Sequence, residues 1–143
     1  MVNIETLANR LQRRTEWQKT PATLYLEDFC EIVHTALKHL YIVTGRAGGY
    51  DETKVSYDTG SPDMPISYDD TLLLDEEEWV LVTAEINFFR KVQTDVNNIL
   101  GYSTDALTVT NADKPYANLD GTIRKLLDDQ RIIYYKMVRY NLL

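Results

Sequence analysis

The chain has 143 residues, a length typical of one domain. Hydrophobic residues make up 44% and charged residues 26%, so a buried core is expected and general disorder is not. A net charge of −7 disfavours binding to phosphate backbones. The single cysteine, Cys30, rules out an internal disulfide and agrees with a reducing compartment. The N-terminus resembles no signal peptide and no apolar run could span a bilayer, so we expect a soluble protein made in a cytoplasm.

The negative charge is unevenly distributed along the chain. Residues 1–49 and residues 79–143 each carry a net charge of +1, whereas residues 50–78 hold ten acidic side chains and one lysine. Such a segment repels DNA, because both carry negative charge. A basic protein surface or a cation is the partner that this charge favours.

Two helices are predicted in the first third of the chain. Ile4, Leu7 and Leu11 share one helical face, which predicts a helix over residues 3–16 with Asn3 as its N-cap. A longer stripe with steps of three and four predicts a second helix over residues 24–44, which Thr23 caps and Gly45 ends.

Residues 46–74 lack helical spacing and are predicted to form an extended acidic loop. Glycine and proline interrupt this segment, and apolar residues alternate with polar ones around Val55 and again around Ile66. This period of two predicts a short hairpin with its turn at residues 59–62. Two strands alone are marginal in water, so the hairpin needs the helices or a partner to hold it. Residues 58–61 match the Asp-Thr-Gly motif of aspartic proteases, but in this setting we interpret them as a turn.

Two long helices are predicted in the second half, over residues 76–100 and 115–141. Asp75 is the expected N-cap of the first, Gly101 ends it, and Pro115 opens the second. Ion pairs at i,i+4 are expected in the last helix between Arg124 and Asp128 and between Lys125 and Asp129. The predicted fold is therefore mainly α: a single domain over residues 1–143, resembling a four-helix bundle, with a hairpin-like insertion between the second and third helices.

Two groups of residues have the side chains that catalysis or metal binding needs. Cys30, His34 and His39 could ligate a metal, but Cys30 lies on the apolar stripe and is interpreted as a core residue. Carboxylates spaced along long helices hold magnesium in some helical nucleotide pyrophosphohydrolases. The residues that could do so here are Glu77, Glu78 and Glu85, facing Asp128 and Asp129. We interpret the cluster at 75–78 as a capped, solvated helix start, and expect neither enzymatic activity nor a metal or cofactor.

Residues 81–140, LVTAEINFFRKVQTDVNNILGYSTDALTVTNADKPYANLDGTIRKLLDDQRIIYYKMVRY, resemble structural proteins of tailed bacteriophages. The layout of the whole chain is similar to that of head–tail connector (adaptor) proteins, which are small and helical with a long loop between helices. The resemblance implies a virion protein of the neck, made in the host bacterial cytoplasm. It further implies a twelve-fold ring that contacts the portal and the tail or stopper proteins, while DNA passes through the channel without specific binding and no membrane is involved.

Ring assembly requires heterologous interfaces, in which two different surfaces of the chain meet. The charge distribution suggests that the acidic loop of one subunit meets basic residues of the last helix of its neighbour. The candidate interface residues are Tyr57, Asp58, Tyr68, Asp69, Asp70, Arg124, Arg131, Lys136 and Arg139. The alternatives are a tail-completion or minor head protein, a metal-dependent nucleotide pyrophosphohydrolase, and an acidic decoy that binds a basic host protein.

Overall fold

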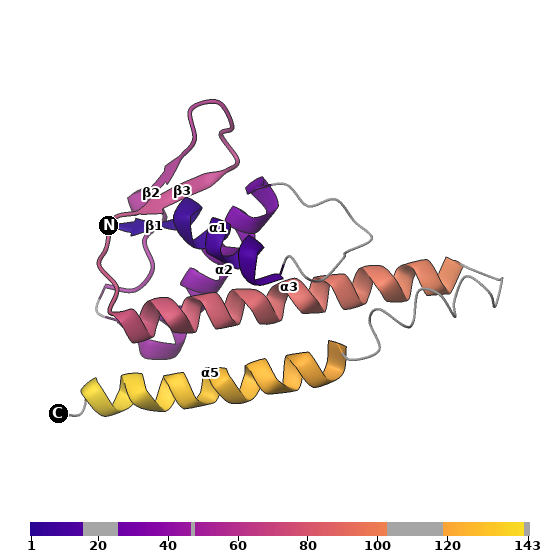
Figure 1. Cartoon of the computed structure of the whole chain (residues 1–143). Coiled ribbons are helices and arrows are strands. Elements are labelled where there is room, and N and C mark those ends of the chain that lie inside the picture. The colour runs from indigo at the N-terminus through magenta and orange to yellow at the C-terminus, as the bar shows by residue number, and fades with distance from the viewer. Residues whose placement is uncertain (16–25, 47, 103–118, 142–143) are drawn as a thin grey trace.

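The computed structural model describes residues 1–15, 26–46, 48–102 and 119–141 (Figure 1). The helices are α1 (Ile4–Thr15), α2 (Leu26–Thr44), α3 (Leu74–Tyr102) and α5 (Leu119–Asn141), and the strands are β1 (Val2–Asn3), β2 (Val55–Tyr57) and β3 (Pro65–Tyr68). A single turn of 3-10 helix, Glu52–Lys54, precedes β2. The prediction of a mainly α fold is confirmed. Of the helices described, none is long and apolar enough to cross a bilayer.

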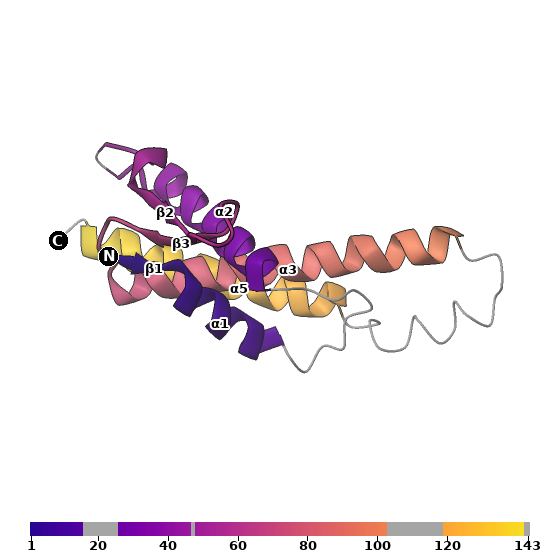
Figure 2. The same ribbon diagram turned by 90° about the horizontal axis from the view of Figure 1, so that it is seen from above.

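Helix α3 is the centre of the core. Helices α1 and α2 pack on one side of it, α5 runs antiparallel along the other, and its C-terminal half extends past α1 and α2 (Figures 1 and 2). Val80, Leu81 and Ala84 are fully buried, and Phe88 stacks on Phe29 of α2 with 5.6 Å between ring centroids. Because apolar residues surround the first half of α3, it can pack against α1 and α2 on one side and against α5 on the other.

The start of α1 and the end of α2 follow from capping. Asn3 accepts a hydrogen bond from the backbone N–H of Thr6 at 2.9 Å, so the predicted N-cap of α1 is confirmed. Gly45 ends α2 with a φ of +60°, which favours glycine. The predicted cap Thr23 and the predicted start at Pro115 lie outside the described residues.

Helix α3 begins earlier and ends later than predicted. Leu73 is the N-cap instead of Asp75, because its N–H donates to Glu76 Oε1 at 2.9 Å and its carbonyl accepts from the N–H of Glu77 at 2.9 Å. Gly101 does not end the helix, which continues to Tyr102. A glycine destabilises a helix by only about 1 kcal/mol, so a helix ends at a glycine only where a turn conformation is the more stable one.

The hairpin forms at the predicted place, but it belongs to a three-stranded sheet. The strand order is β1-β3-β2 with both pairs antiparallel, so Tyr68 lies opposite Val2 on one side and Val55 on the other. The turn is closed by hydrogen bonds between Asp58 N–H and Met64 O at 3.0 Å and between Ser61 N–H and Asp58 O at 3.3 Å. Residues 55–68 of the predicted acidic loop are therefore two strands and their turn, held by the chain's own N-terminus and helices.

Candidate functional site

The carboxylates that begin α3 are paired with arginines of α1. Arg10 binds Glu77 at 2.5 Å, and Arg14 binds Glu78 at 3.0 Å and Glu85 at 2.8 Å. Burial lowers the pKa of Arg14, but its hydrogen bonds to Glu78 and Glu85 outweigh this effect and raise that pKa above its usual value. The C-terminal arginines of α1 therefore serve tertiary packing as well as the helix dipole.

Arg46, just after α2, neutralises two further carboxylates. It binds Glu76 at 2.6 Å and Asp70 at 3.6 Å. Only 8% of the surface of Glu76 is exposed, so the interpretation of this helix start as solvated is wrong for Glu76. The physical reason is that a buried carboxylate is tolerated when it is paired and hydrogen-bonded, and Glu76 also accepts from the backbone of Leu73.

The carboxylates of the hydrolase alternative come partly together. Glu78, Glu85 and Asp129 line a charged groove of about 380 Å³ between α1, α3 and α5. Arg14 lines the same groove and bridges the two glutamates, so a cation of the protein already occupies the space between them. Asp128 is exposed and does not line the groove. Across the described ranges, no three histidine, cysteine, aspartate or glutamate side chains are placed to hold a metal ion.

Cys30, His34 and His39 have three different environments. Cys30 is fully buried, and burial raises the pKa of its thiol to about 11, with a contribution from Glu5. His34 is buried and hydrogen-bonded to the hydroxyl of Tyr50. His39 is exposed on another face of α2. The interpretation of Cys30 as a core residue is confirmed.

A cluster of tyrosines fixes the hairpin to α2. The ring of Tyr68 lies 5.4 Å from that of Tyr50 and 5.5 Å from that of Tyr41 on α2. Tyr41 donates a hydrogen bond to Asp70, and the hydroxyl of Tyr68 accepts one from the backbone N–H of Asp51 at 3.0 Å. Aromatic pairs of this kind contribute about 0.5–1.5 kcal/mol each beyond burial. The hairpin is thus ordered by its own chain.

The structure divides the predicted interface residues of the hairpin into two sets. Tyr57 is 39% exposed, and Asp58 and Asp69 also reach the surface. Tyr68 is 0% exposed and belongs to the core, so placing it at an interface is wrong for this conformation. Asp70 is engaged by Tyr41 and Arg46, and is a poor choice for a contact with another chain.

The predicted basic residues of α5 lie on its surface. Arg124, Arg131 and Lys136 are exposed, and the side chain of Arg139 lies outside the described part. Within the described α5, Arg124 forms no ion pair with Asp128, and Lys125 forms none with Asp129, contrary to expectation. Exposed pairs of this kind contribute at most about 1 kcal/mol, which does not outweigh the solvation of both partners.

Ion pairing within the chain therefore leaves two surfaces of opposite charge. Four of the ten acidic residues at 50–78 are paired with arginines, and all of these lie at residues 70–78. The acidic hairpin, which we define as residues 51–69, retains five carboxylates without an ion pair against one lysine, Lys54. The C-terminal half of α5, residues 130–141, has three cations and no acidic residue.

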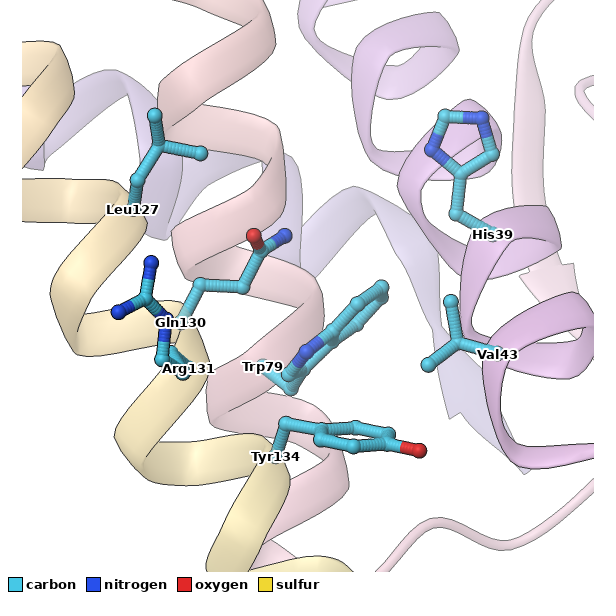
Figure 3. Close-up of a pocket in the computed structure, with 7 residues that line it drawn as sticks. All are labelled: His39, Val43, Trp79, Leu127, Gln130, Arg131 and Tyr134. Atoms are coloured by element: carbon cyan, nitrogen blue, oxygen red, sulfur yellow. The ribbon is translucent and has the colours of Figure 1, made fainter.

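A groove of about 440 Å³ lies between α2, α3 and α5 (Figure 3). Val43 and His39 of α2 form one wall, and Tyr134 and Arg131 of α5 form the other, with Trp79 of α3 between them. Leu127 and Gln130 complete the lining. We call this surface the Trp79 groove.

Each wall of the Trp79 groove has an exposed apolar residue next to it in the sequence. Ile42 beside Val43 is 75% exposed, and Tyr135 beside Tyr134 is 64% exposed. The sequence does not indicate this surface, because Trp79 and Tyr134 lie on stripes typical of core positions, and spacing does not show where a stripe lacks a partner. The only signal in the sequence was the large number of tyrosines, ten against three phenylalanines, which favours interfaces.

Comparison with known proteins gave no match: no family model fits the chain, and no curated protein or solved structure is significantly similar to it.

Proposed function

We propose that this chain is a structural protein of the phage neck, of the head–tail connector type, that assembles into a ring. The observation that supports this proposal best is the division of unpaired charge. The acidic hairpin projects from the side of α3 that carries α1 and α2, and α5 lies on the opposite side (Figure 1). Arg131 and Lys136 of α5 have no ion pair within the described chain.

Two complementary surfaces on opposite sides of one subunit favour head-to-tail contacts. A subunit that offers both surfaces leaves one of each free after every contact, so assembly continues until a ring closes or a filament forms. Unlike charges attract at close approach and set the register, whereas like charges exclude the wrong orientation. In a neck channel, acidic side chains that remain exposed would also keep DNA from binding as it passes.

Sedimentation velocity and negative-stain electron microscopy test this proposal. We expect larger species and closed rings at about 50 mM NaCl and their loss at about 500 mM, because salt screens exposed charges. Asp69→Asn should weaken assembly; Asp70→Asn is unsuitable because it also breaks contacts within the chain. If the chain stays monomeric at every salt concentration and also fails to bind a purified portal ring, the proposal is refuted.

The hydrolase alternative is tested by nucleotide turnover. Wild-type protein should release no pyrophosphate from nucleoside triphosphates in the presence of Mg²⁺ or Mn²⁺, because Arg14 occupies the space between Glu78 and Glu85. Metal-dependent turnover that is lost in Glu85→Gln would favour the enzyme and count against a purely structural role.

A further inference from the structure

We propose that the Trp79 groove receives the tip of the acidic hairpin from a second copy of this chain. The inference rests on the proposed self-assembly and names the two surfaces that meet. The tip comprises residues 58–63, the turn between β2 and β3.

The chemistry of the groove favours an acidic, partly apolar occupant. Its apolar lining comes from Tyr134 and Val43 on the two walls, with the largely buried Trp79, 3% exposed, between them, and Arg131 and His39 supply its polar and cationic groups. No acidic residue lines it. Aromatic centres with a cationic rim are typical of interface hot spots, where apolar contact supplies affinity and charge supplies register.

The tip of the hairpin has the complementary features. Asp58 and Asp63 carry negative charge without an ion pair, and Pro62 between them is exposed and apolar. Three backbone hydrogen bonds hold the turn, Asp58 N–H to Met64 O, Ser61 N–H to Asp58 O and Met64 N–H to Ser61 O. A turn that is already ordered loses little conformational entropy on binding.

A second copy is the occupant that the geometry supports. The tip points away from α5, whereas the groove opens where the C-terminal end of α2 meets α5, so a chain cannot place its own tip in its own groove (Figure 1). Among the described residues, the acidic hairpin is also the segment with the largest unpaired negative charge.

A charge-swap experiment tests the pairing. Arg131→Glu alters the groove, and the double variant Asp58→Lys with Asp63→Lys alters the tip. Each variant alone should associate at least about tenfold more weakly than wild type, because each contact then brings like charges together. An equimolar mixture of the two should regain association, because unlike charges then meet at both kinds of contact. Lys91→Glu, an equal charge change on an exposed position of α3, should behave as wild type.

A second pair of variants tests the apolar centre of the groove. Val43→Glu, at a residue 43% exposed on the wall, should weaken association at least about tenfold. Ile132→Glu is the matched control: this residue is 54% exposed and faces away from Tyr134, since two residues turn a helix by about 200°. Circular dichroism and urea unfolding confirm that each variant folds.

Trp79 itself reports on occupancy. In a Trp17→Phe background it is the only tryptophan, and its emission should shift in parallel with association. If wild type associates but Val43→Glu and the mixture show no specific effect, the groove proposal is overturned and self-assembly stands. If the wild-type protein does not associate either alone or on a portal, the groove proposal and the proposed ring assembly are both refuted.

Discussion

Replacing Tyr68 with phenylalanine should destabilise the fold while leaving the molecular surface unchanged. Tyr68 is 0% exposed, and its hydroxyl accepts a hydrogen bond from the backbone N–H of Asp51 at 3.0 Å. Phenylalanine keeps the ring contacts with Tyr41 and Tyr50 but leaves that N–H without its acceptor.

The expected magnitude follows from the environment of the bond. A buried donor that loses its partner costs about 1–3 kcal/mol. Asp51 is only partly buried, so water can partly replace the hydroxyl, and we expect Tyr68→Phe to lower the free energy of unfolding by about 1–2 kcal/mol. Tyr68→Ala also removes the ring from the cluster and should cost about 3–5 kcal/mol.

Urea unfolding followed by circular dichroism measures both changes. Tyr57→Phe is the matched control, because its hydroxyl bonds Glu52 at 2.6 Å but the side chain is 39% exposed. It should cost no more than about 0.5 kcal/mol, as surface substitutions usually do. If Tyr68→Phe proved as mild as Tyr57→Phe, and if it weakened self-association instead, Tyr68 would belong to an interface and the core assignment would be refuted.

Three further predictions concern the buried polar groups and the glycines. Burial lowers the pKa of His34, with Lys38 adding to and Glu52 opposing this effect, so the unfolded chain binds a proton more readily and stability should fall as the pH drops below 6.5. His34→Gln should flatten this dependence between about pH 5.5 and 7.5, whereas His39→Gln should keep it, as urea midpoints will show. Arg14→Met should cost about 1–3 kcal/mol because Glu85, only 12% exposed, loses its partner; Arg10→Met, in the more exposed pair with Glu77, should cost under about 1 kcal/mol. Gly121→Ala, inside α5 with open space for a Cβ, should raise the free energy of unfolding by about 0.5–1 kcal/mol and so raise the melting temperature. Gly45→Ala, at a φ of +60°, should lower the free energy of unfolding by a similar amount and so lower the melting temperature.

Each of these has an outcome that would contradict its reasoning. If the pH dependence of stability persisted in His34→Gln, it would come from the carboxylates and not from His34. Equal losses in Arg14→Met and Arg10→Met would show that burial of Glu85 does not strengthen its pair. Stabilisation by Gly45→Ala would mean that α2 does not end in the left-handed conformation.

Much of the fold could be predicted because periodicity and capping are local. The stripes over α2 and α3, the cap at Asn3, the stop at Gly45 and the turn after Asp58 each depend on residues a few positions apart. Strand β1 could not be predicted, because two residues carry no period and Val2 forms a strand only by pairing with Tyr68.

The sequence by itself determined the helices, the hairpin and the position of the acidic segment. Only the tertiary structure decided which charges remain unpaired and which apolar residues remain uncovered. Arg14 and Arg46 neutralise carboxylates 24 to 71 residues away, and Trp79 meets Val43 and Tyr134 only where three helices converge. The physical reason is that propensity and capping act within one turn of chain, whereas ion pairing and packing depend on distances in space, which spacing along the sequence does not encode.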